Sequence, residues 1–176
     1  LARIRDSGAD AVLVSLVGGA SVGFNKAFAS FGLADKALRL GTLIEENTLA
    51  GIGPANAKNL YSSAGFFANI QTPAAKAFVA AYAKRFGPEA PMLNGLAESV
   101  YEGFLMMESI ARKAGALSVA KMDPASEGAT YNGPRGTVTM KNRHVQQDIY
   151  VADVDDKGFR VIKTFPRVGS GQTCKV

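Results

Sequence analysis

A short apolar run that ends in two adjacent glycines is the feature that most constrains how this chain folds. Residues 10–17 read DAVLVSLV, which is typical of a parallel strand covered on both faces. The glycines at 18–19 turn the chain, and phenylalanines recur at helical spacing over 24–31. A second apolar run over 37–44 completes the pattern strand, helix, strand. This pattern predicts an α/β fold built on parallel strands.

Further elements are predicted on both sides of this unit. The preceding segment has the pattern of a helix that stops at Gly8, and residues 63–70 read as a third strand. Thr72 and Pro73 begin a helix, because a hydroxyl can cap it and proline is tolerated at its first position. The remaining predicted elements are a long helix closed by Gly115, a turn-rich region beyond residue 123 and a β-hairpin that turns at residues 156–158.

The longest predicted helix carries an apolar stripe, which is typical of a helix packed on a core. We expect Glu98 and Glu102, four residues apart, to form a solvated flank or a contact between lobes rather than an acid–base pair. The order of the elements indicates a chain that leaves one lobe and later returns. The stripe consists of Leu93, Leu96, Ala97, Val100, Phe104, Met107 and Ala111.

Several classes of function are disfavoured by what the motifs lack. The turn reads VGGASVG, which is neither G-x-G-x-x-G nor a loop followed by G-K-[ST]. One histidine, His144, and one cysteine, Cys174, provide neither a multi-histidine metal site nor a thiol pair. The net charge of +5 comes from short basic patches without interleaved aromatic residues, unlike a nucleic-acid surface. We therefore predict a protein that is not an enzyme and has no cofactor.

Backbone N–H groups at the glycine turn are the first candidate for ligand contact. They lie where a strand ends and a helix begins, which is where α/β folds place ligands. Ser21 is expected to cap the helix. After the second strand, Glu46 can contact a ligand, with Glu45 less favoured. The alternative is that these carboxylates stabilise the first turn of the next helix.

Phe66 and Phe67 fall on the third predicted strand, where the chain leaves the lobe. Adjacent strand residues point to opposite faces, so one ring can face a cleft while the other fills the core. Core packing of both is the simpler alternative.

A set of segments in fixed order resembles the C-terminal half of a type I periplasmic binding protein, in the branch of amide- and urea-binding receptors. The resemblance covers about residues 5–165. Its segments begin GADAVLVSLVGG at residue 8, GTLIEENTL at 41, AGFFANIQTP at 64, LAESVYEGF at 96, YNGPRGTVTMKNRH at 131 and VADVDDKGF at 151.

This resemblance implies two α/β lobes joined by three crossovers, with a small-molecule ligand held between them. Phe66 and Phe67 match an aromatic pair at a crossover, and Asn142 with His144 matches a turn before the final hairpin. The second lobe's side of the ligand site would be lined by Ser15, Leu16, Val17, Gly18, Gly19, Ser21, Thr42 and Glu46.

The function implied is that of a receptor for an ABC importer, which captures an amide, urea or amino acid and is read by the transporter's membrane subunits. The location would be periplasmic, with an export signal upstream. The alternatives are a cytoplasmic amide sensor of the same fold and, less favoured, a nucleotide-using enzyme. We expect a fragment of a two-lobed protein that exposes an apolar face, and that either self-associates or is a proteolytic remnant. Its predicted parts are 1–70 (second lobe), 71–125 (helices), 126–168 (β-rich return) and 169–176 (flexible tail).

Overall fold

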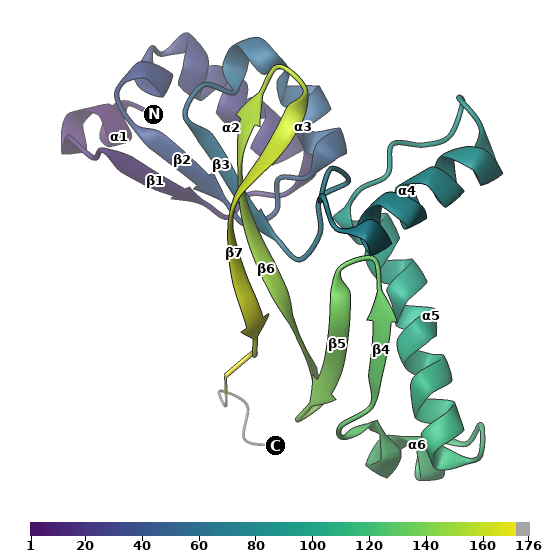
Figure 1. Ribbon diagram of the computed structural model, residues 1–176. Helices are drawn as coiled ribbons and strands as arrows, with labels where there is room; N and C mark the ends of the chain where they lie inside the picture. Colours follow the sequence, from purple (N-terminus) through teal and green to yellow (C-terminus); the bar gives the residue numbers. More distant parts are fainter. Residues whose placement is uncertain (172–176) are drawn as a thin grey trace. The chain divides into compact units, whose positions relative to one another are not determined.

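The computed structural model describes residues 1–171, which form two compact units (Figure 1). The first unit comprises Leu1–Asn69 and Tyr150–Thr164. The second comprises Ile70–Ile149 and the chain from Phe165 onward. Cys174 and most of the predicted tail lie outside the described residues. The finer division of the chain at residues 70, 125 and 168 stays a prediction.

The first unit is an α/β layer, as the sequence predicts. Its elements are α1 (Ala2–Ser7), β1 (Ala11–Val14), α2 (Gly18–Ser30), a 3-10 turn (Leu33–Asp35), β2 (Leu38–Gly41), α3 (Glu46–Ile52), a second 3-10 turn (Pro54–Asn56) and β3 (Leu60–Ala64). The first helix ends at Gly8, which adopts the left-handed conformation with a φ of 69°. The glycine stop and the βαβ pattern are thereby confirmed.

Three parallel strands form the centre of the first unit. Val14 lies beside Gly41, where β1 and β2 both end, and Gly41 lies beside Ser62, two residues before the end of β3. The arrowheads of β1, β2 and β3 point the same way in Figure 1. A hairpin of β6 (His144–Asp155) and β7 (Gly158–Val168) continues the sheet, since β6 pairs antiparallel with β3. The predicted turn at residues 156–158 is confirmed.

The strand predicted over 63–70 is wrong in its position. Strand β3 runs over Leu60–Ala64 and ends before the phenylalanine pair. Aromatic residues favour strands, but pairing with β6 stops at Ala64, opposite Tyr150. The two rings are buried after the chain has left the ladder.

The core of the first unit contains one charged side chain. Phe28, Leu33, Ala34 and Ala37 pack together around the end of α2. Arg39 of β2 is fully buried beside them, with its guanidinium 4.8 Å from the centre of the Phe28 ring. Its Nη1 donates to Asn25 Oδ1 and its Nη2 donates to the carbonyl of Lys58, at 2.8 and 2.6 Å. Burial lowers the pKa of Arg39 to about 10.

The second unit packs helices beside an antiparallel ladder. Its elements are α4 (Pro73–Phe86), α5 (Gly95–Ala114), α6 (Val119–Ser126), β4 (Thr130–Gly133), β5 (Gly136–Lys141) and the start of β6. The predicted cap is confirmed, because Thr72 Oγ1 accepts from the Ala75 N–H at 3.2 Å. Gly115 ends α5 in the left-handed conformation, as expected. Helix α6 was not predicted, since Pro124 and the following turn residues mask it.

The predicted apolar stripe of α5 is not a core stripe within the described chain. Val100 is 65% exposed, Phe104 is 66% exposed and Met107 is 56% exposed. The expected exposed apolar face is therefore present. The buried face carries Glu98, Glu102 and Met106, and Met106 packs with Ala129 and Val138. Among residues 1–171, no helix is long and apolar enough to cross a membrane.

Candidate ligand-binding site

The candidate site is the edge of the first unit where the parallel strands end. The Thr42 N–H donates to the Val14 carbonyl at 3.4 Å, which holds the ends of β1 and β2 together. The segments that follow the three strands therefore emerge at one edge. This arrangement brings the glycine turn and Thr42 to the same edge of the sheet, and contact of either with a ligand stays a prediction.

The segment Ser15–Gly19 leads from β1 into α2 and is exposed throughout. Val17 occupies the N-cap position, and its side chain makes no capping hydrogen bond. The first N–H groups of a helix lack partners within the helix, and the helix dipole places partial positive charge there. Gly18 has a φ of 56°, which a residue with a side chain rarely adopts. This turn can accept a carbonyl or carboxylate oxygen.

Ser21 does not cap α2, which corrects the sequence prediction. It lies inside the helix and is fully buried, and its backbone carbonyl and Oγ accept from Asn25 Nδ2 at 2.8 and 3.4 Å. The helix begins four residues earlier than a cap at Ser21 would allow, because the two glycines are part of its first turn. Ser21 is therefore buried within α2, and its contact with a ligand stays a prediction.

Glu46 is the first residue of α3 and connects it to the segment after β3. Its Oε1 accepts from the Ala68 N–H at 2.7 Å. Its Oε2 is buried and has no hydrogen-bond partner within residues 1–171. Burial raises the pKa of Glu46, and the neighbouring charge of Glu45 adds to this rise. Glu46 therefore follows β2 as the first residue of α3, and its side chain holds α3 to the segment after β3.

Phe66 and Phe67 are 2% and 0% exposed. The Phe67 ring packs against Phe159 of β7, with the ring centres 4.7 Å apart. Both rings lie in the core of the first unit, which is the simpler alternative considered above. Contact of either ring with a ligand stays a prediction.

His144 follows a tight turn between β5 and β6 in the second unit. Asn142 and Arg143 both have positive φ, and the His144 Nδ1 lies 2.7 Å from the Asn142 carbonyl oxygen. The predicted turn before the final hairpin is therefore present. A shallow hollow beside it is lined by Lys141, Asn142, His144, Val145, Gln146 and Gly169–Gly171. None of the ten predicted site residues contributes to this hollow.

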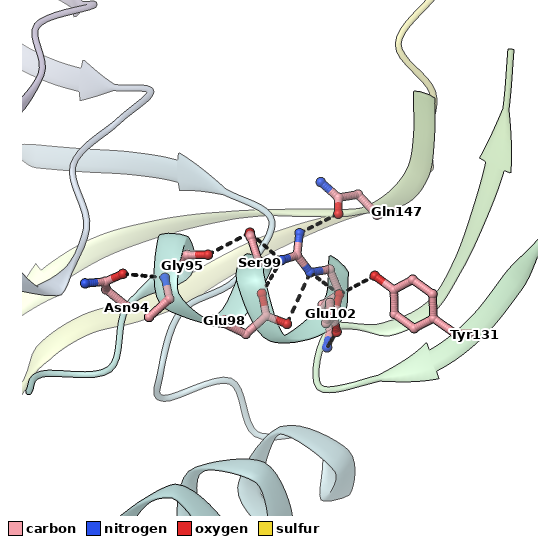
Figure 2. Close-up of polar contacts among 9 residues, drawn as sticks. Asn94, Gly95, Glu98, Ser99, Glu102, Tyr131 and Gln147 are labelled. Atoms are coloured by element: carbon pink, nitrogen blue, oxygen red, sulfur yellow. Dashed lines mark hydrogen bonds and ion pairs between the residues drawn. The ribbon is translucent and has the colours of Figure 1, made fainter. Parts of the chain in front are cut away.

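A buried charged cluster in the second unit was not expected. Arg135 lies between β4 and β5 and forms ion pairs with Glu98 and Glu102 of α5; its Nε is 2.6 Å from Glu102 Oε2 (Figure 2). The Tyr131 hydroxyl donates to Glu102 Oε2 at 2.6 Å. Arg135 Nη1 also donates to Gln147 Oε1 of β6 at 2.6 Å. The prediction of a solvated flank is wrong, since Glu98 and Glu102 are 0% and 2% exposed.

Burial and neighbouring charges in this cluster raise the pKa of Glu98 and the pKa of Tyr131. Burial raises the pKa of Glu98 to about 8, and its proximity to Glu102 adds to the effect, while Arg135 opposes it. Burial and the bond to Glu102 raise the pKa of Tyr131. The sequence signal for this cluster was the placement of both glutamates opposite the apolar stripe. Nothing in the sequence showed that Arg135 would reach them.

A family model described as "Periplasmic binding protein" matches residues 1–159. The chain therefore belongs to the periplasmic binding protein family. A search of curated proteins returned no match.

Solved structures show the same fold. A solute-binding protein of an ABC transporter from Rhodopseudomonas palustris HaA2, in complex with p-hydroxybenzoic acid, is 26% identical; the match has a TM-score of 0.81 and covers 94% of this chain and 48% of that one. An R. palustris protein in complex with 4-hydroxybenzoate is also 26% identical, with a TM-score of 0.83 and coverage of 98% and 50%. A leucine-, isoleucine-, valine-, threonine- and alanine-binding protein from Brucella ovis shares the fold at 19% identity, with a TM-score of 0.82 and coverage of 99% and 48%. The chain thus spans about half the length of these proteins.

Proposed function

We propose that this chain forms part of a solute-binding receptor of a periplasmic ABC importer. The observation that carries the proposal is the exposed Ser15–Gly19 segment at the ends of the parallel strands, in a chain of this family. Capture needs no reacting groups. It needs a surface that binds a solute and a conformation that the transporter's membrane subunits recognise.

The turn favours a ligand with an oxygen acceptor and an apolar body. Uncapped N–H groups at the start of α2 suit a carboxylate or a carbonyl oxygen. Leu16 and Val17 are 39% and 61% exposed beside them, and they offer apolar contact. We therefore place small carboxylates first, including hydroxybenzoates and branched-chain amino acids. Amides and urea, whose carbonyl oxygen suits the same donors, come second.

A glycine substitution in the turn tests this assignment. Gly18→Val places a branched side chain on the exposed turn and disfavours its left-handed φ, so we expect ligand affinity to fall at least tenfold. Gly8→Val is the matched control: Gly8 has a φ of 69°, and an added Cβ meets no atom within 4 Å at either glycine. Titration calorimetry of the intact protein measures both variants. Equal ligand affinity in the two variants would show that the turn is not part of the ligand site.

A further inference from the structure

Strand β2 of the first unit carries a fully buried arginine that has no acidic partner. Arg39 is 0% exposed, whereas a charged side chain is rarely buried unless an opposite charge pairs with it. Its guanidinium pairs with no carboxylate in the part of the chain that the structure describes, and its Nε has no hydrogen-bond partner there. An apolar side chain at such a position is often as stable or more stable. Arg39 therefore contributes something that an apolar residue would not.

The guanidinium of Arg39 connects helix α2 to the segment that leads into β3. Its Nη1 donates to the Oδ1 and the backbone carbonyl of Asn25 at 2.8 and 3.3 Å. Its Nη2 donates to the carbonyls of Asn56 and Lys58 at 3.0 and 2.6 Å. A planar guanidinium donates in fixed directions, whereas apolar contact has no preferred direction. Arg39 therefore fixes where α2 lies along β2 more sharply than apolar packing would.

Asn25 extends these bonds to the first turns of α2. Its Nδ2 donates to the carbonyl and the Oγ of Ser21 at 2.8 and 3.4 Å, and both residues are fully buried. Asparagine inside a helix is locally unfavourable, because its side chain competes with the helix backbone for hydrogen bonds. Here both ends of the amide are used, since Oδ1 accepts from Arg39 while Nδ2 donates to Ser21. The bonds therefore run from β2 to a residue only three positions after Gly18.

We propose that Arg39 and Asn25 are positioning residues for the ligand site at the start of α2. They hold the first turns of the helix against β2, and thereby hold the N–H groups of Gly18 and Gly19 at the edge where β1 and β2 end. Neither side chain touches the ligand, because both are buried. A binding site depends on such supporting bonds to keep its geometry. The proposal rests on the proposed function, since it takes the glycine turn as the ligand site.

A double variant separates positioning from packing. Arg39→Met with Asn25→Leu replaces both partners by apolar side chains, so neither polar group is left buried without the other. The carbonyls of Asn56 and Lys58 belong to half-buried and exposed residues, where water can replace the lost donor. We expect the melting temperature to change little. The affinity for 4-hydroxybenzoate or leucine should fall about tenfold, because the turn loses the directional bonds that hold it.

The matched control is Lys26→Met, which removes an exposed cation from the same helix. It should change neither the melting temperature nor the ligand affinity. Titration calorimetry and thermal unfolding of the intact protein measure both variants. Wild-type affinity in a folded double variant would overturn the proposal, because the bonds of Arg39 and Asn25 would then contribute to packing alone.

The variant Gly18→Val, measured in parallel, distinguishes failure of the positioning role from failure of the proposed function. If Gly18→Val lowers the ligand affinity and the double variant does not, the turn binds the ligand without the support of Arg39. If neither lowers the affinity, the glycine turn is not the ligand site, and the positioning role is refuted with it.

Hydrogen exchange gives a second test that needs no ligand and does not require the double variant to fold. Asn25→Asp keeps an oxygen that accepts from Arg39 but removes the donor to Ser21. We expect the amides of residues 18–24 to exchange about tenfold faster in this variant, while those of β1 and β2 keep their protection. Ser30→Ala is the control, because it removes the bond from Ser30 Oγ to the Lys26 carbonyl near the other end of α2. Equal exchange over residues 18–24 in the two variants would contradict the proposal.

Discussion

At the scale of single residues, Arg135 joins three elements of the second unit. Its side chain pairs with both glutamates of α5 and bonds to Gln147 of β6, and its backbone N–H donates to Glu102 Oε1 at 3.1 Å. A buried pair of acids is tolerated only when donors surround it. Tyr131 and Arg135 supply these donors to Glu102.

Removal of the arginine should be strongly destabilising. Arg135→Met leaves two buried carboxyl groups without their cation, and the loss of one partner of a buried ion pair typically costs about 3–5 kcal/mol. Arg112→Met is the control, because Arg112 pairs with Glu108 on the exposed side of α5 and such pairs contribute about 0.3–0.5 kcal/mol. Urea unfolding followed by circular dichroism measures both. Similar losses in the two variants would refute the structural role of the cluster.

The raised pKa of Glu98 predicts how stability depends on pH. Between the ordinary carboxyl range and about pH 8, the folded state holds a proton that the unfolded state has lost. The free energy of unfolding should therefore fall as pH rises through this window and level off above it.

The variant Glu98→Gln should flatten this slope, because an amide does not ionise, while Glu108→Gln at the exposed pair should leave it unchanged. Urea unfolding between pH 5 and pH 9 provides the measurement. A slope that persists in Glu98→Gln would assign the dependence to another group.

At the scale of elements, caps and glycines could be predicted better than burial. Gly8 and Gly115 end their helices as expected, because left-handed φ values are a local property of glycine. The cap predicted at Ser21 is wrong, because α2 already begins at Gly18 and Ser21 lies inside it. The burial of Glu98 and Glu102 depends on Arg135, more than thirty residues away, so no local pattern reveals it.

The cap of α4 provides a prediction at this scale. Thr72→Ala removes the Oγ1 that accepts from the Ala75 N–H and should cost about 1 kcal/mol. Thr72→Ser keeps a hydroxyl at the same position and should retain most of the stability. Urea midpoints of the two variants give the comparison. Equal loss in both would show that the hydroxyl makes no contribution.

At the scale of the whole molecule, the order of the segments predicted more than any single motif. The sequence of strand, glycine turn, helix and late hairpin agrees with the family match over residues 1–159. The ligand could not be predicted in the same way, because contacts come from a few side chains at the strand ends. Phe66 and Phe67 illustrate this. Strand β3 ends at Ala64, earlier than predicted, and both rings lie after it in the core.

The most direct test of the receptor assignment is a thermal-shift panel on the intact protein. The panel contains 4-hydroxybenzoate, leucine, valine, acetamide, urea and ATP. A ligand at about one hundred times its dissociation constant adds about 2.7 kcal/mol to the free energy of unfolding, which gives a clear rise in melting temperature. We predict a rise with one of the small carboxylates and none with ATP. A rise with ATP alone would contradict the receptor function and would instead support phosphate binding at the glycine turn.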